Sequence, residues 1–212
     1  MSTSSDILST PAAVGSHSPQ DKSKLFLLAG LVLMALSVVG LFTGSEADPS
    51  RPFIGWLLGI SFWLSILVGM LFILMLWWMF DAGWSVIVRR QLEHAIGAFP
   101  VLAVIFLPLV ILSLTMSDGG TVPWIWMDAA ASVPGGHGTV AGDVLYVHKS
   151  PYLDQIFFAV RYLLYFGVWG LLAYFFRKWS FNMDETGDHG NVHRSRRLAA
   201  AGLFLCAFAT TF

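Results

Sequence analysis

The chain has 212 residues, of which 56% are hydrophobic and 12% are charged, and its formal net charge is −1. An ordinary soluble domain carries about 25% charged residues, so this composition and the mean hydropathy of +0.70 exclude a typical soluble domain and predict an integral membrane protein. The apolar blocks are much longer than a buried strand, which favours membrane-spanning helices over a barrel. A net charge this close to zero gives no indication of a nucleic-acid partner, and we predict none.

The N-terminal region combines a polar tail with a first apolar block. Residues 1–24 are rich in Ser, Thr, Pro and Gly, so we expect a disordered tail. Residues 25–42 are apolar and are predicted to form the first membrane span. The sequence Ser45-Glu46-Ala47 resembles a cleavage site, so a signal peptide is the alternative interpretation of this block.

The second apolar block runs from Phe53 to Val88 and contains one charge, Asp81. A helix of that length would measure about 54 Å, whereas the hydrocarbon core of a bilayer is about 30 Å thick. We therefore predict a second span over residues 53–80, followed by a polar helical extension over residues 81–96. A third span is predicted over residues 97–116.

The second half of the chain contains one clear span between two polar segments. Residues 117–154 form a connection longer than a turn requires, and such loops are often functional. Residues 155–176 are predicted to form the fourth span and residues 177–197 a charged connector. The last apolar block, residues 198–212, would extend only about 22 Å as a helix, so we expect an incomplete fifth span and the N-terminal part of a longer protein.

Basic residues are distributed unequally between the two sides of this predicted topology. Nine of the twelve lie in the tail, the extension after the second span and the connector after the fourth, whereas Arg51 and Lys149 lie in the opposite connectors. The positive-inside rule places the N-terminus in the cytoplasm and residues 117–154 outside.

Charged residues in the polar extension have two interpretations. Asp81, Arg89 and Glu93 recur at multiples of four residues and would share one helix face, with His94 beside it. The extension is either an interfacial helix with solvated charges or part of a proton path, because a carboxylate within the membrane is costly and is often functional. The proton-path candidates are Asp81, Arg89, Glu93 and His94.

Arg161 lies about 9 Å inside the fourth predicted span. Asp154 and Tyr165 are spaced so that they lie near the same helix face. Arg161 therefore either extends its charge to the interface or belongs to a polar pocket near the outer face.

Cysteine and histidine positions argue against ligation of a metal cofactor by this chain. Cys206 is the only cysteine, and all six histidines lie outside the predicted spans. We therefore predict no iron-sulfur cluster, no b-type haem and no other metal site within the chain, and we assign no catalytic residue.

Three segments carry a family resemblance: GWSVIVRR with EH three residues later, LYVHKSPYLDQIFFAVRYLLYF at residues 145–166, and KWSFNMDETGD at residues 178–188. They resemble the ActF-type membrane subunit of bacterial alternative complex III, a quinol:cytochrome c oxidoreductase, within the NrfD-like group that includes the polysulfide reductase membrane subunits. The resemblance implies an all-α fold, in which this chain forms helix one and the first four-helix bundle of a ten-helix protein, with the fifth helix truncated.

The resemblance also implies a role in the respiratory chain. The chain would be a multi-pass subunit in the bacterial inner membrane, not catalytic alone, that contributes a scaffold, a quinol-site environment and a proton pathway. Its partners would be membrane lipid, an iron-sulfur protein, a multihaem cytochrome and a sister NrfD-like subunit, which would hold the clusters and haems. The alternatives are a polysulfide-reductase-type quinol anchor and a transporter or scaffold without a redox role. The residues matched to the outer pocket and quinone environment are Lys149, Tyr152, Asp154 and Arg161, and helical spacing adds Tyr165 to this predicted pocket.

Overall fold

The computed structural model describes residues 22–42, 51–80, 86–115, 124–133, 138–186 and 190–211. These residues are mainly helical and contain no β-strand, which confirms the predicted all-α class for the part of the chain described. Contacts divide the chain into two units, Met1–Thr43 and Gly44–Phe212.

The first unit contains one helix, α1, Lys22–Phe42. Its apolar part, Lys24–Gly40, falls at the short end of the range of about 17–25 residues that can span a bilayer. The apolar side chains described along α1 are largely exposed. An exposed apolar surface of this kind suits contact with lipid or with another apolar helix.

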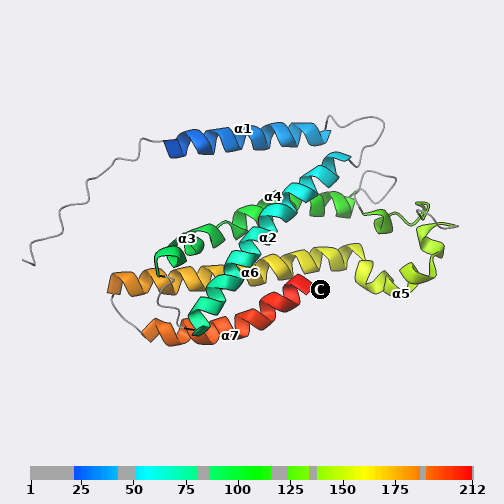
Figure 1. The fold of residues 1–212 in the computed structure, drawn as a ribbon. Helices are drawn as coiled ribbons and strands as arrows, with labels where there is room; N and C mark the ends of the chain where they lie inside the picture. Colours follow the sequence, from blue (N-terminus) through cyan, green and yellow to red (C-terminus); the bar gives the residue numbers. More distant parts are fainter. Residues whose placement is uncertain are drawn as a thin grey trace, which may run out of the picture. The chain divides into compact units, whose positions relative to one another are not determined.

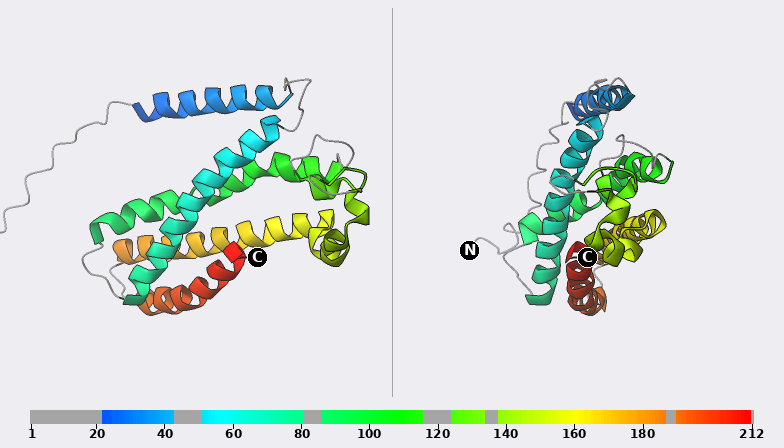
Figure 2. Two further views of the ribbon diagram at one scale, coloured as in Figure 1. Left: turned by 45° about the vertical axis from the view of Figure 1, so that its right-hand side comes forward. Right: turned by 90° about the vertical axis from the view of Figure 1, so that its right-hand side faces the viewer.

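The second unit is a bundle of long helices with shorter elements at one end. Helix α7 packs against α2 and α6, and α4 packs against α2 and α6 (Figure 1). Helix α2 slants across α6, as the further views also show (Figure 2). The elements in chain order are α2 (Arg51–Phe80), α3 (Val86–Ile96), α4 (Phe99–Thr115), the 3-10 helices η3 (Ile125–Met127) and η4 (Val140–Gly142), α5 (Val144–Leu153), α6 (Gln155–Thr186) and α7 (Gly190–Thr211).

Three helical segments in the described part of the chain are long and apolar enough to cross a membrane: Arg51–Phe80, Val88–Thr115 and Gln155–Thr186. They correspond to the second, third and fourth predicted spans and identify the chain as a membrane protein. Helix α6 extends beyond the predicted end of its span, because it continues past residue 176 to Thr186. The predicted connector over residues 177–197 is thus largely helical.

Local sequence accounts for several of the helix starts. Pro52 and Pro100 each occupy the second position of their helix, where a proline costs no hydrogen bond. The Asp143 carboxylate accepts a hydrogen bond of 3.0 Å from the Leu145 backbone amide and caps α5. Side-chain capping and proline therefore fix where these helices begin.

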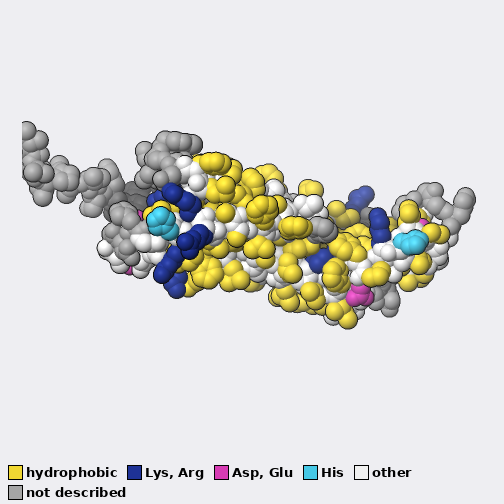
Figure 3. Space-filling view, turned by 90° about the horizontal axis from the view of Figure 1, so that it is seen from below, with side chains coloured by type: hydrophobic (Ala, Val, Ile, Leu, Met, Phe, Trp, Pro, Cys, Tyr) yellow, Lys and Arg dark blue, Asp and Glu magenta, His cyan; other side chains and the backbone are white. Residues whose placement is uncertain are grey.

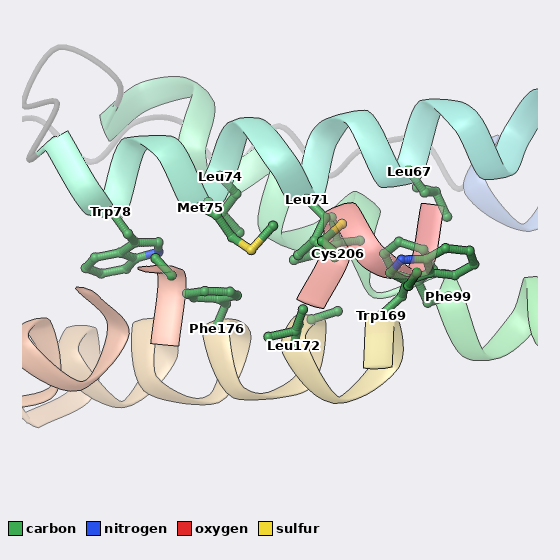
Figure 4. Packing of buried hydrophobic residues seen from close by; sticks show 14 of the residues in the cluster. Leu67, Leu71, Leu74, Met75, Trp78, Phe99, Trp169, Leu172, Phe176 and Cys206 are labelled. Atoms are coloured by element: carbon green, nitrogen blue, oxygen red, sulfur yellow. The ribbon is translucent and has the colours of Figure 1, made fainter. Parts of the chain in front are cut away.

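The core lies where α2, α4, α6 and α7 meet. Leu67, Leu71, Leu74 and Trp78 share one face of α2 and are buried. Figure 4 shows side chains of α2 and α6 pointing toward one another. Further buried members of the cluster are Met75, Phe99, Trp169, Leu172, Phe176 and Cys206.

Candidate functional site

A cavity of about 380 Å³ lies beside the first half of α6 and receives side chains from α2, α4, α5, η3 and the residue before η3. Among the described residues that line it, Arg161 is the one with a charge, and most of the others are aromatic. We call this feature the aromatic cavity. The aromatic members of its lining include Phe106, Trp124, Trp126, Tyr152, Tyr165 and Phe166.

Arg161 lies against aromatic rings in the wall of this cavity. Its Cζ atom is 3.8 Å from the centroid of the Tyr152 ring and 5.2 Å from that of the Phe157 ring. A cation over an aromatic face is stabilised by the ring quadrupole, which helps to offset the cost of removing the guanidinium from water. The stacked geometry holds the arginine in place without neutralising its charge.

Two groups of nitrogen donors have different roles at the aromatic cavity. Trp124 Nε1 donates to Ser113 Oγ at 2.7 Å, which fixes its ring against α4. Arg161 Nε and Trp126 Nε1 are buried and have no hydrogen-bond partner among the described residues. Because buried donors are nearly always satisfied in folded proteins, these two could meet the oxygen atoms of a bound molecule.

The structure separates the five residues predicted for the outer pocket. Tyr152, Arg161 and Tyr165 line the aromatic cavity together. Lys149 lines a neighbouring hollow of about 210 Å³. Asp154 caps α6 instead, because its Oδ2 atom accepts hydrogen bonds from the backbone amides of residues 156 and 157 at 3.0 and 3.2 Å.

Sequence reasoning assigned no role to Trp124 and Trp126 in this pocket. Both lie in the polar connection between α4 and α5, and their rings stack with centroids 5.5 Å apart. Two tryptophans in a predicted polar loop were a usable signal, because such side chains seldom remain in water without packing.

A second site lies at the opposite end of the bundle, where α3 packs against α6. The Glu93 carboxylate is fully buried there. Its Oε2 atom accepts hydrogen bonds from Arg90 Nη1 at 3.0 Å and from Ser180 Oγ at 2.8 Å, and Arg89 Nε lies 3.5 Å from Oε1. An unpaired buried carboxylate would be strongly unfavourable, so these neighbours make the burial of Glu93 tolerable.

Arg90 extends the network from Glu93 toward the end of α6. One of its terminal nitrogens pairs with Asp184, and its guanidinium lies 4.4 Å from the Phe181 ring centroid. Arg89 in turn lies 4.8 Å from the ring centroid of Trp78. We call the group formed by Arg89, Arg90, Glu93, Ser180 and Asp184 the Glu93 network.

The structure brings two of the four proton-path candidates, Arg89 and Glu93, into this network. His94 packs beside Phe181, with ring centroids 5.5 Å apart. Asp81 lies outside the described residues. Ser180 and Asp184 were not predicted, and their place in the DETGD-containing segment was the only signal for them.

Potential metal ligands are dispersed in the described residues, where no three His, Cys, Asp or Glu side chains come together in a metal-binding group. Cys206 is buried within the core cluster.

The helices and these two sites define an all-α membrane protein with a charge network around the buried Glu93 at one end and an aromatic cavity at the other. Comparison with models of protein families gives no match for this chain, and comparison with curated proteins also gives none.

Proposed function

We propose that the chain is a membrane subunit of a bacterial respiratory quinol:electron-acceptor oxidoreductase of the alternative complex III type. The observation that carries this proposal is the aromatic cavity with Arg161 in its wall. In this role the chain lies in the inner membrane with its N-terminus in the cytoplasm. It is not catalytic alone, since the haems and iron-sulfur clusters are held by partner subunits.

A quinol head group suits the cavity in size and chemistry. Binding sites for small molecules have volumes of about 300–1,000 Å³ and combine apolar walls with a few polar groups, and the aromatic cavity measures about 380 Å³. The flat ring of a quinol can stack on the aromatic walls. Its oxygens can accept hydrogen bonds from Arg161 Nε and Trp126 Nε1, which are among the buried donors without a partner in the described residues.

The quinol supplies two electrons and two protons when it is oxidised, and the residues of this chain bind and orient it. Aromatic walls exclude water, and Arg161 stabilises negative charge on an oxygen that has lost its proton. Tyr165 lies near Arg161 and Tyr152, where its hydroxyl can hold or pass on that proton.

The proposal assigns proton exchange on the opposite side to the Glu93 network and its surroundings. Arg89, Glu93 and His94 remain the candidates there, together with Asp81 from the sequence. A buried carboxylate that is paired with arginines and with a hydroxyl is a suitable site for a proton relay. The same pairing would also suit a purely structural anchor, as in a scaffold without a redox role.

Two experiments test the proposal. The full chain, tagged and purified from native membranes, should bring with it subunits that contain multihaem cytochrome and iron-sulfur centres, detected by absorbance and iron content. Isolation as a complex without redox centres would contradict the proposal and favour the transporter or scaffold alternative. A complex with a polysulfide-reductase-type catalytic subunit would instead favour the quinol-anchor alternative.

The second experiment measures quinone binding by the purified full chain. A short-chain quinone should quench tryptophan fluorescence in a saturable way, and Arg161→Leu should weaken this binding. Arg197→Leu is the matched control, because it removes an exposed arginine at the opposite end of the bundle. Equal quenching in both variants and in the unmodified chain would exclude the aromatic cavity as the quinone site.

A further inference from the structure

A separate hollow of about 590 Å³ lies where the end of α6 meets the start of α7. Lys178 and Arg194 contribute two positive charges to its lining and Glu185 contributes one negative charge. The remaining lining residues are Trp179, Phe181, Asn182 and Asn191. The combination of two cations, two amides and an indole is suited to a ligand with an anionic oxygen-rich group.

The hollow lies at the level expected for lipid head groups. Helix α6 has 32 residues, a length of about 48 Å, so it must extend beyond a hydrocarbon core of about 30 Å. The charged residues of α6 after Phe176 mark the end that leaves the core, and Trp179 among them is a residue type enriched at the interface. Figure 3 shows Lys and Arg side chains gathered at this end, next to a largely hydrophobic surface.

The hydrophobic surface beside the hollow provides a place for acyl chains. Leu171 and Tyr174 precede Lys178 by seven and four residues and therefore lie on nearly the same face of α6. They are 60% and 54% exposed. A ligand with its anionic group in the hollow could thus lay an apolar chain along this face, which free phosphate has no means to do.

We propose that this hollow binds the phosphodiester head group of an anionic phospholipid. Lys178 Nζ and the Arg194 guanidinium pair with the phosphate oxygens, and the side-chain amide of Asn182 donates to the glycerol oxygens. Arg194 Nη1 already lies 3.4 Å from Asn191 Oδ1, which orients the guanidinium at the edge of the hollow. The first turn of α7 adds the positive end of its helix dipole. This inference requires only that the chain lies in a membrane and does not depend on the redox role.

Lipid binding to the purified full chain tests the proposal. Native mass spectrometry would compare retention of phosphatidylglycerol with that of phosphatidylcholine of the same acyl chains. The unmodified chain should prefer phosphatidylglycerol, and the double variant Lys178→Gln with Arg194→Gln should lose most of that preference, at about fivefold per cation removed. Glu185→Gln should strengthen the preference, because it removes a negative charge from the lining.

The control is Arg197→Gln, which removes one exposed charge of α7 outside the lining of the hollow. It should leave the preference nearly unchanged. If Arg197→Gln reduced the preference for phosphatidylglycerol as much per charge as the double variant does, the proposal would be overturned. The preference would then come from diffuse attraction between basic side chains and anionic lipids. Displacement of phosphatidylglycerol by inorganic phosphate alone would also overturn it, since free phosphate would then be the occupant.

Discussion

The hydroxyl of Ser180 donates a hydrogen bond of 2.8 Å to the carboxylate of Glu93, although 87 positions separate the two residues in the chain. Both side chains are fully buried. The bond connects α3 to α6 and adds a partner from α6 to the two arginines of α3 that already contact the carboxylate. The Glu93 network therefore joins the polar ends of two membrane-spanning segments as well as holding a charge.

Replacement of Glu93 should destabilise the folded chain. Glu93→Ala leaves the partly exposed Arg89 without its carboxylate partner and the buried Ser180 hydroxyl without its acceptor, and leaving a buried donor unsatisfied costs about 1–3 kcal/mol. Glu93→Gln keeps an acceptor for Ser180 and should cost less. The measurement is thermal unfolding in detergent, followed by circular dichroism.

Glu185→Gln is the control for loss of a carboxylate, because Glu185 is exposed on α6. It should leave the unfolding temperature nearly unchanged. If Glu93→Ala were no more destabilising than Glu185→Gln, the Glu93 network would have no structural role. If Glu93→Gln assembled normally but changed proton uptake during quinol oxidation, a role in proton transfer would be supported.

Substitution of Gly202 should disturb the contact of α7 with its neighbours. A Cβ atom at this position would lie 2.9 Å from Met75 Sδ and 3.0 Å from Leu172 Cδ2. Overpacking of a core costs about 1–3 kcal/mol, so Gly202→Ala should lower the unfolding temperature.

The matched control is Gly170→Ala on α6, where nothing lies within 4 Å of the added methyl group. Alanine has the higher helix propensity, by about 1 kcal/mol, so this variant should be as stable as the original chain or slightly more so. If both variants lowered the unfolding temperature equally, the close approach of α7 to α2 and α6 would not be the cause of the destabilisation.

The geometry of Arg161 predicts a graded response at the aromatic cavity. Arg161→Lys keeps the positive charge but loses the planar group that stacks 3.8 Å from the Tyr152 ring centroid. Quinone affinity should therefore fall less than in Arg161→Leu but remain below that of the original chain. Fluorescence titration with a short-chain quinone measures the affinities of both variants.

Tyr152→Leu tests the same stacking from the other side. Loss of a cation–π contact costs about 0.5–2 kcal/mol, depending on how far it is shielded from solvent, so binding should weaken even though Arg161 is retained. The control is Tyr174→Leu, because Tyr174 is an exposed tyrosine of the same helix, α6, and lies 13 residues after Arg161 in the sequence. An unchanged affinity in Tyr152→Leu would show that the ring does not position Arg161 for the ligand.

The distribution of basic residues predicts the orientation of the chain. The thiol introduced by Glu185→Cys should react with a membrane-impermeant reagent only after the cells are opened. The thiol introduced by Ala141→Cys should react in intact cells. Both positions are exposed, whereas the native Cys206 is buried and should give little background. The reverse pattern of labelling would overturn the proposed topology.

Much of the helical architecture follows from the sequence by itself. Long apolar blocks predicted spans over residues 53–80, 97–116 and 155–176, and the described structure has membrane-length helices over each of them. This part was predictable because hydropathy is a local property and because a chain in lipid must satisfy its own backbone hydrogen bonds. The sequence also predicted Glu93 as a proton-path candidate and Arg161 as a residue of an outer polar pocket.

The partners of those charges depend on the tertiary structure. Ser180 reaches Glu93 only because α3 packs against α6, and Trp126 joins Arg161 only because the segment before α5 folds back over α6. Asp154 shows the converse, since a residue with suitable spacing for a pocket caps a helix instead. Sequence spacing fixes which residues share a helix face, but the packing of distant elements decides what that face meets.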